Sequence, residues 1–328
     1  MEELNEDLIN IGSNLKMAHN FSNNINFCLN DWNSESINLF RDEFIEQKSE
    51  KWFKKRMIGG SDVGTILGQT KHYKTKDGEY RTRENILKEK IEFFKDPKNF
   101  QFQSNDATNH GNKYEDFAGF LYTKYTKSMT MFLGIHQHEE YKFLTVSPDL
   151  ISNKNGGSLI EIKCPYNRKI IDFDSYPKSN LDILKNYYPK NKNINLKLQS
   201  LNYEKIDYYE QITSSKTFEL IKESLEKKKL FLYHTITNLS IEEINMMKKV
   251  PYYYSQIQFQ NHVCKLTNNV DFIQLGIPPN QNYSEPYLPQ LLITSIPYDP
   301  NWLNENISIL SNFWIELTNE LSKFNIHL

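Results

Sequence analysis

The 328-residue sequence has little of what marks several common protein classes. Its three cysteines, Cys28, Cys164 and Cys264, lie far apart and form no C-x-x-C pair, which argues against a zinc knuckle and a disulfide framework. No run approaches the roughly 18 apolar residues of a membrane span. The acidic residues 1–7 are the opposite of a basic signal-peptide start. We therefore expect an intracellular protein in a reducing compartment, with no membrane partner.

An excess of charge of one sign is also lacking. Lys and Arg number 39 against 41 Asp and Glu, so the formal net charge is −2. The field of the whole molecule therefore does not indicate nucleic-acid binding, and any such contact must come from a local basic lining. With 38% hydrophobic, 13% aromatic and 24% charged residues, the composition is that of a folded globular protein.

Changes in amino-acid composition along the sequence divide the chain into three segments. Residues 1–45 form an Asn- and Ser-rich N-terminal extension with scattered apolar positions. Residues 46–328 are predicted to form one domain. Within it, residues 167–249 are rich in Lys, Asn and Tyr and are interpreted as an insertion.

Apolar spacing predicts the helices that matter for function. One helix is expected over residues 36–56, broken near Ser49, and a second is introduced by Gly111. Glu115 lies beside the apolar stripe of this second helix. After a glycine pair, Ser61 is expected to cap a short helix.

The strongest signal is a hairpin that bears two carboxylates. Asp149 begins its first strand, an Asn- and Gly-rich turn follows, and Glu161 and Lys163 lie on its second strand. Side chains alternate faces along a strand, so Glu161 and Lys163 share one face. The turn brings Asp149 alongside Glu161. Two carboxylates and a strand carbonyl, that of Ile162, make the oxygen ligand set that Mg²⁺ prefers.

Lys163 supplies a positive charge two positions from Glu161. Its ammonium can orient or help deprotonate an attacking water and can offset the charge of the transition state, so the hairpin predicts phosphodiester hydrolysis. An ordinary hairpin with solvent-facing charges is the competing interpretation of this short pattern. His136 and His138 also alternate along a strand, but no third ligand has suitable spacing, so we interpret them as ordinary strand residues.

Further motifs decide between these interpretations. In chain order they are Trp52-x-x-x-Arg56, Ile58-Gly59-Gly60-Ser61-Asp62, Gly111-Asn112-x-Tyr114-Glu115, Ser147-Pro148-Asp149, Leu159-Ile160-Glu161-Ile162-Lys163-Cys164-Pro165 and Tyr253-Tyr254-Ser255-Gln256-Ile257-Gln258. Together they resemble the PD-(D/E)xK nucleases, and within them the phage lambda exonuclease and YqaJ-type viral recombinase family. The resemblance covers most of residues 46–166 and 250–325. It implies a restriction-endonuclease-like α/β core with a central mixed sheet flanked by helices.

The resemblance assigns roles to the residues of the hairpin and of one helix. Asp149, Glu161 and Lys163 match the catalytic core of the family, and Glu115 matches a helix carboxylate that faces the metals. With the Ile162 carbonyl, the three carboxylates are the metal ligands that the resemblance implies. The expected cofactor is Mg²⁺, for which Mn²⁺ would substitute.

Gln256 matches the first glutamine of the family motif Y-x-Q-h-Q, where h is apolar. Its amide is expected on the active-site side of a helix packed beside the hairpin. Residues 208–212 are a competing match, which lies closer to Lys163 but lacks the second glutamine. The choice of Gln256 requires residues 167–249 to be an insertion.

Arg56 and Ser61 match family positions that hold the terminal phosphate of the DNA. A Gly-Gly-Ser turn that enters a helix offers backbone N–H groups and a hydroxyl to an anion, and a guanidinium can bind the anion in bidentate fashion. The segment between Arg56 and Ser61 is shorter than usual in the family. Lys54 or Lys55 is therefore an alternative source of the positive charge.

The sequence thus predicts a Mg²⁺-dependent DNA exonuclease, acting 5′ to 3′ on duplex ends in viral DNA replication, recombination or repair. The alternatives are a structure-specific endonuclease or nickase on the same core and a nuclease-fold interaction protein that acts on host factors. The expected partner is duplex DNA with a free end. A second copy of the chain and a single-strand annealing or replication protein are further candidate partners. For a viral protein, the host cytoplasm or a viral replication site is the expected location.

Overall fold

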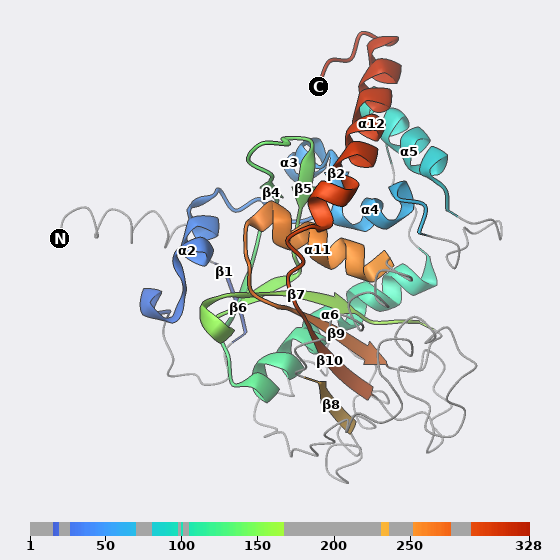
Figure 1. Ribbon diagram of the computed structural model, residues 1–328. Helices are drawn as coiled ribbons and strands as arrows, with labels where there is room; N and C mark the ends of the chain where they lie inside the picture. Colours follow the sequence, from blue (N-terminus) through green and yellow to red (C-terminus); the bar gives the residue numbers. More distant parts are fainter. Residues whose placement is uncertain are drawn as a thin grey trace.

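The computed structural model describes residues 16–19, 27–69, 81–97, 100, 105–166, 231–235, 252–276 and 290–328 (Figure 1). These residues form a mixed α/β fold in which helices flank a central mixed sheet, so the predicted fold class is confirmed. No helix in the described ranges is long and apolar enough to cross a membrane.

The helices and strands follow one another from an N-terminal edge strand to a long C-terminal helix. The helices are α2 (Ser34–Arg41), α3 (Glu50–Lys55), α4 (Gly60–Ile66), α5 (Arg83–Lys95), α6 (Asp106–Thr126), α11 (Tyr252–Cys264) and α12 (Trp302–Ser322). The strands are β1 (Lys16–His19), β2 (Ile58–Gly59), β3 (Thr130–Phe132), β4 (His136–Gln137), β5 (Leu144–Val146), β6 (Leu150–Ser152), β7 (Ser158–Lys163), β8 (Phe231–Thr235), β9 (Val270–Gly276) and β10 (Gln290–Ile296).

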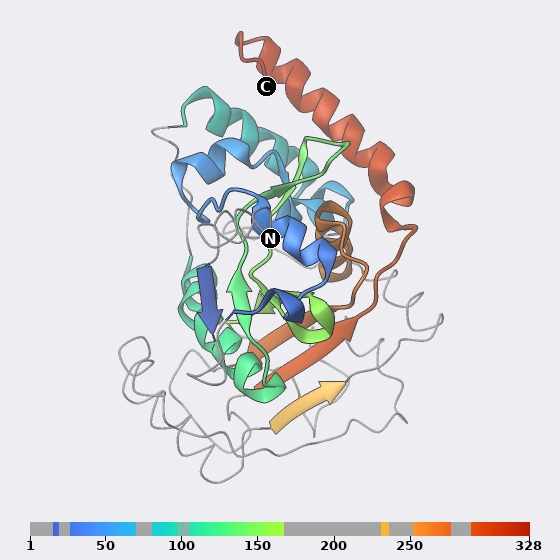
Figure 2. The same ribbon diagram turned by 90° about the vertical axis from the view of Figure 1, so that its left-hand side faces the viewer.

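The predicted hairpin forms the middle of the main sheet. The seven strands have the order β1-β3-β6-β7-β9-β10-β8, in which β6 and β7 are antiparallel and β7 and β9 are parallel. Figure 2 shows β1 and β8 at the two ends of this sheet. A second, smaller sheet has the order β2-β5-β4. Because β7 is flanked on both sides, the residues at its end are held by the register of two neighbouring strands.

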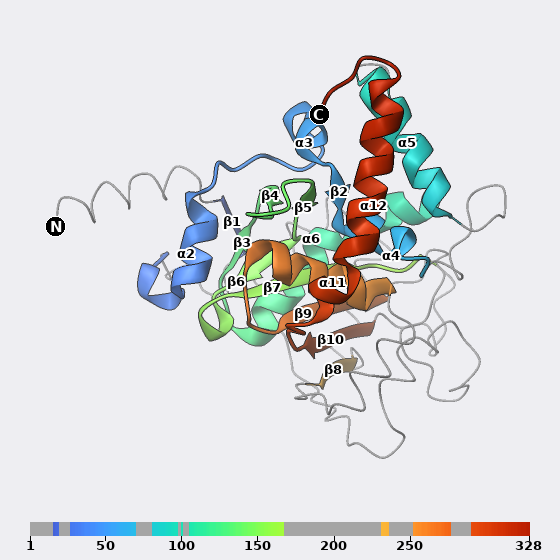
Figure 3. The same ribbon diagram turned by 45° about the horizontal axis from the view of Figure 1, so that its top comes forward.

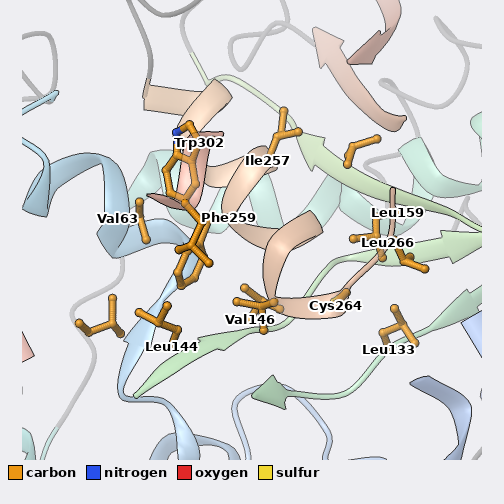
Figure 4. Packing of buried hydrophobic residues seen from close by; sticks show 14 of the residues in the cluster. Val63, Leu133, Leu144, Val146, Leu159, Ile257, Phe259, Cys264, Leu266 and Trp302 are labelled. Carbon is orange, nitrogen blue, oxygen red and sulfur yellow. The ribbon is translucent and has the colours of Figure 1, made fainter. Parts of the chain in front are cut away.

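Helices cover both faces of the sheet at the hairpin. Figure 3 shows α11 lying across one face of the sheet, with α6 on the other side. Ile160 and Ile162 pack against α6 in one hydrophobic cluster. Leu159 belongs to the larger cluster, which includes residues of α4, α11 and α12 (Figure 4). In that cluster Phe259 of α11 is fully buried and Trp302 of α12 packs against it edge to face.

Two segments outside the predicted core contribute to this fold. β1 pairs with β3, and Trp32 and Phe40 of the predicted N-terminal extension are buried in the larger cluster. β8, which lies within the predicted insertion, pairs in parallel with β10. The rest of residues 167–249 lies outside the described residues, and the domain boundaries stay predictions.

Two predicted helix starts were wrong. α6 begins at Asp106 and not at Gly111, because the Asn105 side chain caps it by accepting the Thr108 N–H at 2.9 Å. Ser61 does not cap α4 either. The carboxylate of Asp62 performs this task and accepts the N–H of Gly59 at 3.1 Å. The predicted helix is broken, as expected, but the break covers residues 42–49, and Ser49 at its end caps α3.

Two of the glycines at helical positions, Gly64 and Gly111, give a stability test of this packing. A Cβ at Gly64 would overlap the ring of Tyr252, whose hydroxyl donates to the Ser61 carbonyl at 3.2 Å. A Cβ at Gly111 in α6 would meet nothing within 4 Å. Gly64→Ala is therefore expected to lower the free energy of unfolding by about 1–3 kcal/mol. Gly111→Ala should raise it by about 0.5–1 kcal/mol, because alanine is the better helix former.

Urea unfolding of both variants beside the parent protein measures the two changes. An equal effect of the two substitutions would contradict the tight contact between α4 and α11.

Candidate active site

Strand register places the two hairpin carboxylates side by side. Leu150 of β6 pairs with Ile160 of β7, so Asp149, one residue earlier, lies across from Glu161. The Asp149 carboxylate accepts the N–H of Ile162 at 2.7 Å. This bond fixes Asp149 to the strand that bears Glu161, which is the arrangement that the hairpin predicted.

Glu161 lies in a polar contact with α11. It is 1% exposed, and its two carboxylate oxygens have separate partners on that helix. Gln256 donates its amide to Oε1 at 2.5 Å, and Gln260 donates its amide to Oε2 at 2.6 Å. Gln256 therefore lies on the hairpin side of the helix, as predicted, whereas the competing residues 208–212 lie outside the described residues.

The sequence reasoning missed Gln260. It lies outside the family motif, but a signal was present in its spacing. Residues four apart on a helix share a face, so a helix that directs Gln256 at Glu161 directs Gln260 to the same side.

Lys163 is a direct partner of Glu161. Its ammonium donates to the Glu161 carboxylate and also to the Ile162 carbonyl at 3.2 Å. Burial alone would lower the pKa of this ammonium, but the carboxylates of Glu161 and Asp149 raise it above its ordinary value. The side chain is therefore positively charged at neutral pH.

The carboxylates of Asp149, Glu161 and Glu115 repel one another in a site that is largely shielded from solvent. Burial, together with the charges of Glu161 and Glu115, raises the pKa of Asp149 well above its ordinary value. Glu115, half-buried on α6, also has a raised pKa, first because of burial and further because of Glu161 and Asp116. Negative charge is thus concentrated at the end of β7 beyond what Lys163 alone offsets.

The donors at this point suit a divalent cation. Among the described residues, no group of three or more His, Cys, Asp or Glu side chains is arranged closely enough to hold a metal ion by itself. The set consists instead of the Asp149 and Glu161 carboxylates and the Ile162 carbonyl, all hard oxygen ligands. Two of these donors already bind a cation, the ammonium of Lys163. The residues present therefore fit Mg²⁺, with Glu115 as the further carboxylate.

Arg56 and Ser61 meet in a second polar cluster. The Arg56 guanidinium donates to the Ser61 hydroxyl at 2.5 Å and stacks on the Trp52 ring at 4.9 Å from its centroid. The carboxylate of buried Asp62 lies 3.6 Å from the Arg56 guanidinium and forms an ion pair with the Lys90 ammonium at 3.0 Å. Although burial would raise the pKa of Asp62, the charges of Lys90 and Arg56 hold it below its ordinary value. The cluster has more positive than negative charge.

Of the alternatives for the phosphate-binding cation, the geometry favours Arg56. Lys54 and Lys55 are both exposed, and Lys54 pairs with Glu50 at 2.7 Å on the same helix, α3. The backbone N–H groups of the glycine turn are partly used, because Gly59 donates to Asp62. An anion at this cluster would therefore be bound by the guanidinium and the Ser61 hydroxyl.

The two clusters adjoin each other. Trp52, which stacks on Arg56, donates its indole N–H to the Ser147 hydroxyl at 2.7 Å, two residues before Asp149. On the other side, a Cβ at Gly60 would lie 3.5 Å from the Gln256 side chain. The Arg56 and Ser61 cluster is therefore next to the carboxylate pair.

The paired histidines have structural partners. His136 lies 3.0 Å from the Asp42 carboxylate, and Nδ1 of His138 accepts the backbone N–H groups of Glu140 and Tyr141. His136 lies in β4, as predicted, whereas His138 follows the end of that strand.

Comparison with known proteins identifies the segment that contains most of this site. The family model of the YqaJ-like viral recombinase domain matches residues 51–191. The family resemblance predicted from the motifs is thus confirmed for this segment. The YqaJ-like segment includes the hairpin, Glu115 and the Arg56 and Ser61 cluster, whereas α11 lies beyond it.

A curated relative and two solved structures are also similar to the chain. Protein R354 of Acanthamoeba polyphaga mimivirus is 28% identical over 137 residues, which are 38% of this chain and 23% of that protein. The chain thus spans less than a quarter of the length of this relative. An alkaline exonuclease from Laribacter hongkongensis aligns over 84% of this chain and 96% of its own, with 18% identity and a TM-score of 0.45. A phage-related exonuclease from Haemophilus somnus aligns over 80% and 96%, with 16% identity and a TM-score of 0.40.

Proposed function

We propose that the protein is a Mg²⁺-dependent DNA exonuclease that hydrolyses phosphodiester bonds from duplex ends in viral DNA replication, recombination or repair. The observation that carries the proposal is half-buried Asp149 paired across the strands with buried Glu161, with Lys163 beside them, inside a segment that matches the YqaJ-like viral recombinase domain. The proposed partner is duplex DNA with a free end, and the proposed polarity is 5′ to 3′.

The proposed chemistry assigns a task to each side chain. Asp149, Glu161, the Ile162 carbonyl and Glu115 would hold Mg²⁺, which when bound activates a water and stabilises charge on the phosphate oxygens. Lys163 holds a proton at its Nζ and places a positive charge at the carboxylate pair, where an attacking water would be oriented. Gln256 holds the Glu161 carboxylate in place through its amide.

The Arg56 and Ser61 cluster supports the exonuclease mode over the nickase mode. A guanidinium and a hydroxyl 2.5 Å apart, next to the carboxylate pair, suit a terminal phosphate. An enzyme that cuts within a closed circle has no such end to bind. We therefore propose that this cluster anchors the 5′ phosphate.

The deciding experiment compares linear and closed DNA. Purified protein is incubated with end-labelled linear duplex and with relaxed closed circular duplex, each in Mg²⁺ and in EDTA. We expect release of nucleotides from the linear duplex in Mg²⁺ alone. Efficient cutting of circles would favour the endonuclease or nickase, and no cleavage in any divalent metal would favour a binding protein with a nuclease fold.

The phosphate anchor gives a prediction of its own. Linear duplex with a 5′ phosphate should be degraded faster than the same duplex with a 5′ hydroxyl, and Arg56→Ala should remove the difference. A charged hydrogen bond contributes about 1.5–3 kcal/mol, so the expected preference is about 10- to 100-fold in kcat/KM. Steady-state rates on the two duplexes measure it. Lys54→Ala is the control and should keep the preference, since Lys54 pairs with Glu50. An unchanged preference in Arg56→Ala would remove Arg56 from the anchor.

A further inference from the structure

We propose that Gln260 is a positioning residue that orients Glu161 for metal binding. The inference rests on the proposed metal-dependent function and adds to it a residue outside the family motif. Its amide donates to Oε2 of Glu161 at 2.6 Å, opposite the bond of 2.5 Å from Gln256 to Oε1.

The spacing along α11 explains how one helix reaches both oxygens. Tyr252, Gln256 and Gln260 are four residues apart and therefore form one face of the helix. Tyr252 contacts the Ser61 carbonyl, and the two glutamines contact Glu161. This face of α11 thus runs from the proposed phosphate anchor to the carboxylate pair.

Two amides fix a carboxylate more completely than one. A single donor leaves a carboxylate free to rotate about the bond that joins it to the side chain, whereas a donor on each oxygen fixes its plane. Each carboxylate oxygen has two acceptor positions. Oε1 accepts from both Gln256 and Lys163, whereas Oε2 accepts from Gln260 alone and keeps one position available for a metal cation. Such supporting bonds orient metal ligands, and their loss weakens metal binding by about 10- to 100-fold.

The hydrogen bonds of buried Gln260 differ from those of a glutamine that only stabilises the fold. Gln260 is 2% exposed, and among the described residues its carbonyl oxygen Oε1 has no hydrogen-bond partner. A buried acceptor without a partner destabilises the folded state. Gln258 on the same helix is fully buried with both ends of its amide paired, to the Pro297 carbonyl and the Asp299 N–H. Gln258 stabilises the fold, whereas Gln260 contributes its one bond to Glu161.

The test compares Gln260→Met with Gln258→Met. Methionine keeps the length of glutamine and removes the amide. Mn²⁺ binding to each variant and to the parent protein is measured by calorimetry without DNA, and thermal unfolding is measured in EDTA. We expect Gln260→Met to bind Mn²⁺ about 10- to 100-fold more weakly. Its melting temperature should fall less than that of Gln258→Met, because the lost bond to Oε2 of Glu161 is partly offset by removal of the unpaired Oε1. Gln258→Met should lower the melting temperature and keep the Mn²⁺ affinity.

The outcomes separate the inference from the proposed function. If the parent protein binds Mn²⁺ and Gln260→Met binds it equally well, Gln260 does not position Glu161 and the inference is wrong. If the parent protein binds no Mn²⁺, the metal site itself is wrong, and the inference falls with it. Should Gln260→Met fail to fold, Gln260→Asn, whose shorter amide does not reach Oε2, replaces it in the same comparison.

Discussion

Replacing Glu161 by glutamine is expected to lower the turnover number for DNA hydrolysis by about 10³-fold or more. The substitution removes an anionic ligand from the proposed metal site. It also places an amide N–H where Gln256 and Gln260 both donate, so one of these donors loses its acceptor. Single-turnover cleavage of linear duplex in saturating Mg²⁺ measures the change.

Asp149→Asn is the companion substitution for this prediction. An asparagine oxygen can still accept the Ile162 N–H, so the hairpin should keep its geometry while its ligand charge is lost. Near-parental degradation of DNA by either variant in Mg²⁺ would show that the carboxylate pair is not the site of hydrolysis. A melting temperature close to that of the parent protein is the control for folding.

A second large loss of turnover in DNA hydrolysis is expected from Lys163→Ala. The Lys163 ammonium is bound to Glu161 and to the Ile162 carbonyl, which places its charge at the carboxylate pair. We therefore expect turnover to fall by about 10²–10³-fold. DNA affinity, measured in Ca²⁺ to prevent cleavage, should change little.

Lys154 offers a matched control in the same hairpin. It pairs with buried Asp271 at 2.6 Å, near the turn between β6 and β7. Lys154→Ala should therefore lower the melting temperature and leave turnover close to that of the parent protein. Equal losses of DNA affinity and turnover in Lys163→Ala would instead make Lys163 a phosphate-binding residue.

The hairpin could be predicted from sequence because its determinants are local. Alternation along β7 and an Asn- and Gly-rich turn set the register, and the register puts Asp149 across from Glu161. The meeting of Arg56 and Ser61 follows from their separation by only five residues. Short-range geometry of this kind depends little on the rest of the chain.

Features that depend on distant contacts were not predicted. Gln260 lies 99 residues from Glu161 in sequence, and its role depends on how α11 crosses β7. The pairing of β8 with β10 likewise joins distant segments. The early start of α6 was missed for another reason. Its first turn is polar, so it shows no apolar periodicity, and only the Asn105 cap marks it.

The position of Trp52 gives the protein an internal optical reporter. Its indole stacks on Arg56 and donates to Ser147, so it touches both halves of the site. Indole emission responds to neighbouring charge and to hydrogen bonding. Of the four tryptophans, Trp32 and Trp302 are buried in the core and Trp314 stacks on Phe143. If the proposed anchor binds a phosphorylated DNA end in Ca²⁺, we expect a change in fluorescence that Trp52→Phe abolishes, without any attached dye.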